Sequence, residues 1–276
     1  MTDNGHILLH RDVPFGRIEF EHHTTGAREY RAYHLRDLDG RRRRMVSVTS
    51  FLGILHKQAL LRWYEETGMR NAIAAERAGT LADIGLDQVV DYLRKNEMGA
   101  EHAAKIAAHR GTSVHAALET YFRDGTVPNP ARYPPDARPY IRHAVRWLLD
   151  AERRGLEVED VERLVAHPGY DYAGRMDLRA RLGGLPYVID WKTNRHGRVW
   201  DEQHLQPIAY AVADEKCGAE PVHGCLIVAI GPNGYEEMRS CAEPADFQAI
   251  LDVYRRLGKL RNAVKAERHR LEAVAA

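Results

Sequence analysis

The segment YDYAGRMDLRARLGGLPYVIDWKT, residues 170–193, decides the fold. Its two halves are short β-type runs separated by a GG turn, so they predict two neighbouring antiparallel strands. The preceding run VEDVERLVAH, residues 158–167, has the same character and is followed by the turn signal HPG. Together these three runs predict an antiparallel meander.

Two carboxylates stand on neighbouring strands of this meander. Asp177 lies near the middle of the second strand, and Asp190 ends the third. Adjacent strands can bring such side chains together, and two like charges that close repel each other unless a cation lies between them. Oxygen ligands suit Mg²⁺ or Mn²⁺. The pattern therefore indicates a candidate metal site.

Lys192 follows Asp190 by two residues, so both side chains point to the same face of an extended strand. An ammonium group there can orient a water molecule or stabilise charge on a phosphoryl oxygen. Trp191 is expected to point into the core, while its backbone carbonyl faces the cluster as a neutral metal ligand. Taken alone, Asp190 and Lys192 are more simply explained as a structural ion pair in an α+β enzyme of unrelated chemistry.

Two helices contribute polar pairs at i and i+4 spacing, which places both members on one helix face. His115 and Glu119 form the first pair and neighbour an apolar stripe. Gln206 and Tyr210 form the second pair and can hydrogen-bond phosphate or orient the lysine and water. Each pair alone also fits an ordinary helix surface or core. The order of all these polar residues along the chain is what favours a functional site.

The rest of the chain predicts strands and helices around the meander. RIEFEHH and EYRAYHL flank TTGA within residues 17–48 and predict an N-terminal hairpin. Thr49 or Ser50 is expected to cap a short helix at 51–56. Further helices are expected at 58–78, 86–97, 100–122, 136–154, 201–216 and 244–270, and further strands at 222–230 and in YEEMRS.

This order of elements predicts an α/β or α+β layer structure with helices packed on a sheet. We expect one domain over residues 1–276, because no repeat or low-complexity linker interrupts the chain. Its parts would be a hairpin extension at 1–48, a helical part at 49–155 and a sheet core with a C-terminal helix at 156–276.

The net charge of +1 gives no global signal for nucleic-acid binding. The charge is uneven, however, since RRRR at 41–44 and the run from Arg255 to Arg270 are basic. Such patches can bind phosphates along a groove. Solvated surface charge explains each patch equally well.

The cysteines and the first residues bear on location. Cys217, Cys225 and Cys241 form no CxxC motif and are odd in number, which argues against a disulfide framework or a four-cysteine metal site. Reduced thiols favour a cytoplasmic protein. The opening MTDNGHILLHRDVPFG lacks the apolar core of a signal peptide, and no apolar run is long enough to span a membrane.

Four motifs, in this order, resemble the RecB-like branch of the PD-(D/E)XK nuclease superfamily. They are GTSVHAALE at 111–119, AGRMD at 173–177, VIDWKT at 188–193 and QPIAY at 206–210. They match the family patterns G-x-x-x-H-x-x-x-E, G-x-x-D, D-x-K and Q-x-x-x-Y. VTSFLGILHKQALLRWYEETG at 48–68 resembles the helical opening of stand-alone members. The resemblance implies a restriction-endonuclease-like fold, with a mixed β-sheet core flanked by helices.

The resemblance also implies roles for individual residues. The implied catalytic residues are Lys192, Glu119, Asp177, Asp190, Gln206 and Tyr210. The expected metal ligands are His115, Glu119, Asp177, Asp190 and the carbonyl of Trp191. Residues expected to bind the substrate are Arg175, Thr193, Arg195 and Arg198, together with His196 and the basic C-terminal helix.

The activity implied by the resemblance is that of a DNA nuclease using one or two Mg²⁺ or Mn²⁺ ions. We expect an exonuclease that leaves 5′-phosphates, of the stand-alone kind found in phages, prophages and bacterial genomes. Single- or double-stranded DNA ends are the expected substrate, and a recombinase or strand-annealing protein is an expected partner in recombination or repair. No iron–sulfur cluster is expected, because the cysteines lack the required number and spacing. A non-catalytic DNA-end-binding or assembly module is the alternative.

Overall fold

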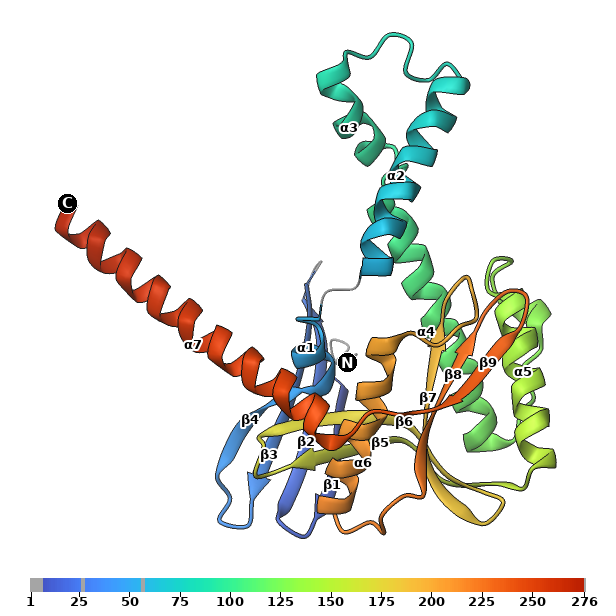
Figure 1. The fold of residues 1–276 in the computed structure, drawn as a ribbon, viewed down its shortest axis with the longest axis vertical. Coiled ribbons are helices and arrows are strands. Elements are labelled where there is room, and N and C mark those ends of the chain that lie inside the picture. The colour runs from blue at the N-terminus through green and yellow to red at the C-terminus, as the bar shows by residue number, and fades with distance from the viewer. Residues whose placement is uncertain (1–6, 26–27, 56–57, 276) are drawn as a thin grey trace, which may run out of the picture.

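The structure is a computed structural model that describes residues 7–25, 28–55 and 58–275. Within these residues, nine strands form a sheet in the order β1-β2-β3-β4-β6-β7-β8-β9, with β5 paired to β6 (Figure 1). The strands are β1 (Ile7–Val13), β2 (Gly16–Thr25), β3 (Arg28–Asp37), β4 (Arg42–Ser47), β5 (Leu156–His167), β6 (Tyr172–Leu182), β7 (Leu185–Thr193), β8 (Gly224–Ile230) and β9 (Tyr235–Arg239).

Helices cover the sheet and extend beyond it. They are α1 (Val48–Leu52), α2 (Gln58–Arg77), α3 (Leu86–Lys95), α4 (Ala100–Asp124), α5 (Arg138–Arg153), α6 (Leu205–Lys216) and α7 (Pro244–Ala275), with short 3-10 turns η1 (Pro130–Arg132) and η2 (Asp201–His204). Figure 1 shows α2 and α3 rising as an arm above the sheet, and α4 leading from that arm back to the body. Within the described residues, every helix is too short or too polar to cross a bilayer.

Strand β6 is the centre of the sheet because it has three partners. On one side it pairs with antiparallel β5 along its length. On the other side its first residues, Tyr172 and Ala173, pair with parallel β4, and its last residues, from Leu178 onward, pair with antiparallel β7. The stretch 174–177 lies between these two partners, so β4 and β7 diverge from β6 there.

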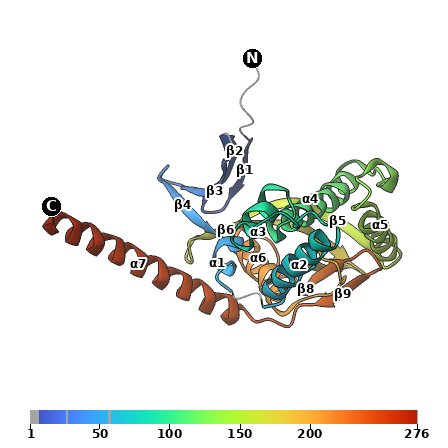
Figure 2. The ribbon, with the colours of Figure 1, turned by 90° about the horizontal axis from the view of Figure 1, so that it is seen from above.

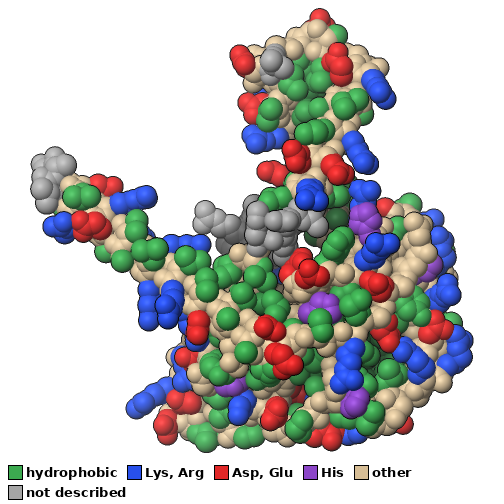
Figure 3. Space-filling view, in the orientation of Figure 1, with side chains coloured by type: hydrophobic (Ala, Val, Ile, Leu, Met, Phe, Trp, Pro, Cys, Tyr) green, Lys and Arg blue, Asp and Glu red, His purple; other side chains and the backbone are tan. Residues whose placement is uncertain are grey.

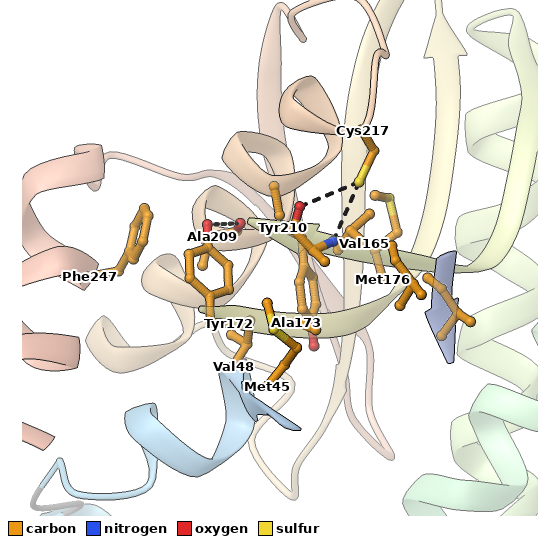
Figure 4. Packing of buried hydrophobic residues seen from close by; sticks show 14 of the residues in the cluster. Met45, Val48, Val165, Tyr172, Ala173, Met176, Ala209, Tyr210, Cys217 and Phe247 are labelled. Atoms are coloured by element: carbon orange, nitrogen blue, oxygen red, sulfur yellow. Dashed lines mark hydrogen bonds between the residues drawn. The ribbon is translucent and has the colours of Figure 1, made fainter. Parts of the chain in front are cut away.

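Two hydrophobic clusters pack the helices against the sheet. The first joins α1, α6 and the start of α7 to the strands, and includes Val188 of β7 (Figure 4). The second joins α4 and α5 to the strands, and includes Ile189 and Trp191. Because neighbouring residues of β7 enter different clusters, the two clusters lie on opposite faces of this strand. Asp190 and Lys192 therefore share the face of Val188, as the sequence predicted.

Charged groups tie the N-terminal strands to the core. Asp214 of α6 is fully buried and accepts hydrogen bonds from Arg11 of β1 (3.2 Å), Arg163 (2.8 Å) and Arg179 (2.8 Å). Three guanidinium groups around one carboxylate offset the cost of burying its charge. The β1 strand, which the sequence did not predict, is anchored by this contact.

The basic run 41–44 is also engaged in the fold. Arg42 pairs with Glu19 and Glu21 of β2, and Arg43 pairs with Asp171 at 3.1 Å. Carboxylates within the fold therefore balance much of the charge that the sequence offered as a phosphate-binding patch.

Most predicted elements are confirmed, including the β2–β3 hairpin, the β5–β7 meander and the long helices. The prediction for the short helix is wrong in detail. Helix α1 begins at Val48, and Ser47 caps it by accepting a hydrogen bond from the backbone N–H of Ser50 at 3.0 Å. Part of the predicted range 51–56 and of the TTGA turn lies outside the described residues.

Gly174 is required by the packing of Tyr210, and replacing it by alanine is expected to destabilise the protein. A Cβ at Gly174 would lie 2.4 Å from Cε1 of the buried Tyr210 ring. Overpacking of this kind costs about 1–3 kcal/mol. Chemical denaturation of Gly174→Ala should show this loss of unfolding free energy.

The matched control is Gly68→Ala in α2, where a Cβ would meet nothing within 4 Å. This change should leave stability unchanged or raise it by up to about 1 kcal/mol, because alanine favours helix. Equal stability of the two variants would contradict the packing argument.

Candidate metal and catalytic site

Asp177 and Asp190 meet where β7 leaves β6. The last paired residues of these strands are Leu178 and Ile189, so Asp177 and Asp190 are the next residues in register. The Asp177 carboxylate continues the ladder, since its Oδ2 accepts a hydrogen bond from the backbone N–H of Trp191 at 2.8 Å. The prediction that neighbouring strands bring these two carboxylates together agrees with this geometry.

Glu162 of β5 extends the same row of carboxylates. The residues on either side of Glu162 pair with those on either side of Asp177, so the two lie directly opposite each other. Glu162 has a φ of 55°, which is uncommon for a residue with a side chain. Glu162 was not predicted from the sequence, although counting outward from the HPG turn of the β5–β6 hairpin identifies it as the partner of Asp177.

His115 of α4 joins these carboxylates. Ligand atoms of His115, Glu162 and Asp177 all lie within 4.8 Å of one another, and His115 Nδ1 is 3.7 Å from Asp177 Oδ2. The imidazole ring packs edge-on against Trp191, with ring centroids 6.0 Å apart. Carboxylate oxygens and an imidazole nitrogen are both ligands of divalent metal ions, so these residues fit a divalent cation.

Asp190 and Lys192 form an ion pair beside this cluster. Burial raises the pKa of Asp190, the Asp177 carboxylate adds to this effect, and the Lys192 ammonium opposes it. Burial favours the neutral amine of Lys192, but the carboxylates of Asp190 and Asp177 outweigh it and raise its pKa. Lys192 therefore stays protonated at neutral pH, and it keeps 22% of its side chain exposed. The ion pair and the carboxylate cluster, offered as alternatives by the sequence, exist together.

Gln206 and Tyr210 of α6 act on Asp190. Gln206 Nε2 donates to Asp190 Oδ1 at 3.0 Å and lies 3.2 Å from the Tyr210 hydroxyl. Tyr210 is buried, and burial raises its pKa well above the ordinary value. These contacts fit residues that position Asp190 more than residues that contact a substrate.

Glu119 lies one turn beyond His115 on α4. Its Oε1 pairs with Arg123 Nη2 at 2.6 Å. Among the described residues, the ligand atoms within 4.8 Å of one another belong to His115, Glu162 and Asp177, and this group does not include Glu119. Glu119 is nevertheless near enough for its charge to raise the pKa of Glu162.

Arg175, expected to bind the substrate, pairs with Glu162 in this structure. Its Nε lies 2.5 Å from Glu162 Oε2, and its guanidinium lies 5.4 Å from the centre of the Phe20 ring. Burial raises the pKa of Glu162 to about 7, and the Asp177 and Glu119 carboxylates contribute to this rise against the opposing charge of Arg175. The N-terminal sheet thus contacts the edge of the site through Phe20.

The other residues expected to bind substrate follow β7. Arg195, His196 and Arg198 are exposed, and Thr193 is half-buried. Thr193 Oγ1 lies close to Gly111 of α4: a Cβ atom added to this glycine would be only 2.9 Å from the hydroxyl oxygen. The exposed side chains are therefore free to meet a phosphate backbone next to the ion pair.

A family model described as "PD-(D/E)XK nuclease superfamily" matches residues 87–273 of the chain. This match covers more than half of the chain, and the chain belongs to the PD-(D/E)XK nuclease superfamily. The mixed sheet flanked by helices is the restriction-endonuclease-like fold that the sequence predicted. The superfamily consists of nucleases that use divalent metal ions, and His115, Glu162, Asp177, Asp190 and Lys192 all lie inside the matched range.

No curated protein matches the chain. Among solved structures, 15 chains match. One of them, titled "Crystal structure of SSO0001", is 18% identical, with a TM-score of 0.30 over 52% of this chain and 71% of that chain.

Divalent metal is expected to stabilise the protein more at high pH than at low pH. Because burial raises the Glu162 pKa from 4.5 to about 7, the metal-free protein loses stability as pH rises through this window. Metal ligands must be deprotonated, so affinity rises over the same window. Thermal melts with and without MnCl₂ should show a larger metal-induced shift at about pH 8 than at about pH 6.

Glu162→Gln tests the origin of this pH dependence. The amide does not titrate, so the difference between the two pH values should shrink in this variant. Asp171→Asn is the matched control, because Asp171 is an exposed acid of the β5–β6 turn. If Glu162→Gln kept the full pH dependence of the metal-induced shift, Glu162 would not be a ligand.

Proposed function

We propose that this chain is an Mg²⁺- or Mn²⁺-dependent deoxyribonuclease that hydrolyses phosphodiester bonds. The observation that carries the proposal is the juxtaposition of His115, Glu162 and Asp177 with the protonated Lys192. Phosphodiester hydrolysis needs charge neutralised on the phosphoryl group and a positioned water. The candidate cation site would neutralise the phosphoryl charge, and the Lys192 ammonium group beside it would position the water.

The chain's own residues would divide the work as follows. His115, Glu162, Asp177 and Asp190 would hold one or two cations, with the Trp191 carbonyl and Glu119 as further ligands. A cation bound there lowers the pKa of water and polarises the phosphoryl oxygen. Lys192 would donate hydrogen bonds to the attacking water or the phosphoryl oxygen, and Gln206 would hold Asp190 in place for both tasks.

The finer proposal is an exonuclease that leaves 5′-phosphates and acts in DNA recombination or repair. Its support is the resemblance of the motifs at 111–119, 173–177, 188–193 and 206–210 to stand-alone RecB-like nucleases of phages and bacteria. DNA would approach along the exposed Arg195 and Arg198 side.

A non-catalytic DNA-end-binding module is the competing proposal. Burying charged groups is costly. A module without catalysis would have no need to keep the buried Asp190 carboxylate and the largely buried Lys192 ammonium next to a cluster of metal-ligand side chains. The Lys192 ion pair with Asp190 and the adjacent His115–Glu162–Asp177 cluster therefore favour the enzyme.

Lys192→Ala is expected to abolish most cleavage and to spare DNA binding. Removing one preorganised electrostatic group of this kind costs about 10²–10³-fold in rate. Cleavage of labelled DNA with Mg²⁺ or Mn²⁺ should fall by this factor, while gel-shift binding stays close to wild type.

The matched control is Lys216→Ala, which removes an exposed lysine at the end of α6. It should cleave at the wild-type rate. A wild-type protein that is inert on single- and double-stranded DNA in both metals would support the binding module instead.

Linear DNA is expected to be degraded from its ends, and covalently closed circular DNA is expected to survive. Substrates labelled at the 5′ or the 3′ end show the polarity of the same reaction. Rapid cleavage of closed circles would contradict exonuclease action while leaving the nuclease proposal intact.

A further inference from the structure

Helix α7 leaves the body of the protein. It has 32 residues and therefore a length of about 48 Å. Phe247 and Leu251 near its start are buried in the first hydrophobic cluster. From Lys259 to Ala273 every residue is exposed, and Figures 1 and 2 show this half projecting away from the sheet.

Helix α7 carries an apolar stripe with a heptad repeat that continues into the projecting half. Ile250, Leu257, Val264 and Leu271 are seven residues apart, and Val253 and Leu260 each follow by three. The next position of the second series is Glu267, which pairs with Arg270 at 2.7 Å. This alternation of three and four residues is the a/d pattern of a coiled coil. Val253, Leu257, Leu260, Val264 and Leu271 are between 37% and 59% exposed. Figure 3 shows hydrophobic side chains along this helix, interspersed with basic ones.

Helices in proteins gain most of their stability from packing an apolar face. The projecting half of α7, from Lys259 to Ala273, is exposed throughout and lacks this stabilisation. Gly258 weakens the helix further just where it leaves the body. We therefore expect another helix to pack against the apolar stripe in the functional complex.

The charges beside the stripe define what can cover it. Residues 255–270 contain seven Lys or Arg residues and a single Glu. In the heptad frame set by Leu257, four of the five e and g positions between residues 256 and 270 carry arginine, and the fifth carries Ala263. The arginines are Arg256, Arg261, Arg268 and Arg270. Charges at the e and g positions determine the partner of a coiled coil through salt bridges between the helices. Arginines on both sides of the stripe therefore favour a partner helix with acidic residues at its own e and g positions.

We propose that the 256–273 half of α7 is a docking helix for a partner protein that presents an acidic amphipathic helix. The two would pair as a coiled coil, with the apolar stripes in contact and the four arginines opposite carboxylates. This docking does not depend on the proposed chemistry, because the helix lies apart from the His115–Asp177 cluster.

Two other occupants are disfavoured by the same charges. A second copy of the chain would place arginines opposite arginines in either helix orientation. A DNA-binding helix would use its basic face without an apolar stripe between the charges. Here the arginines border the stripe on both sides.

The test uses the full chain and a fluorescein-labelled synthetic peptide of four heptads, with Ile at a, Leu at d and Glu at e and g. We expect binding by fluorescence anisotropy that weakens as NaCl is raised. The control peptide with Lys at e and g should not bind. Leu260→Glu should weaken binding by at least about tenfold, because it places a charge in the seam.

Ala266→Glu makes the same change of charge on the outer face of the exposed helix and should weaken binding by less than about twofold. Both variants should retain nuclease activity and the wild-type melting temperature. Absence of acidic-peptide binding overturns the proposal, as does a dimer of the chain that Leu260→Glu dissociates. Loss of DNA binding in Arg256→Glu/Arg261→Glu/Arg268→Glu, without peptide binding, would assign the helix to DNA instead.

Discussion

The hydrogen bond from the Trp191 backbone N–H to the Asp177 carboxylate holds the site together. At this point β7 stops pairing with the backbone of β6, and the side chain of Asp177 replaces the lost ladder contact. One carboxylate oxygen is thereby fixed by the main chain, and it is the same oxygen that lies nearest His115. Asp190, Lys192 and the carbonyl of Trp191 are positioned by the strand end that this bond secures.

A second chain of contacts reaches the site from the opposite helix layer. Gly174 lets the Tyr210 ring approach β6, and Gln206 connects Tyr210 to Asp190. The glycine and tyrosine of two separate motifs are therefore explained by one contact. Packing alone is enough to require both residues, and neither of them needs to touch DNA.

Most strands, the long helices and the ordered motifs of the candidate site could be recognised in the sequence, because periodicity and motif spacing mark them. The residues that could not be predicted depend on pairing across elements. Glu162 joins the cluster through the β5–β6 register, which becomes apparent only when the two strands are paired outward from the HPG turn. In the sequence Arg42 is part of a basic run, but in the fold it pairs with two carboxylates of β2, which are far away along the chain. Local sequence does not contain such long-range contacts.

The row of Glu162, Asp177 and Asp190 comes from three adjacent strands, and this has a consequence for the rigidity of the site. Neighbouring strands are held about 4.8 Å apart where their backbones hydrogen-bond. The β5–β6 pairs on either side of Glu162 and Asp177 hold the backbones of these two residues, and Asp190, beyond the last β6–β7 pair, is held from its other side by β8. The backbone positions of all three residues are therefore set by the sheet and change little when a loop moves.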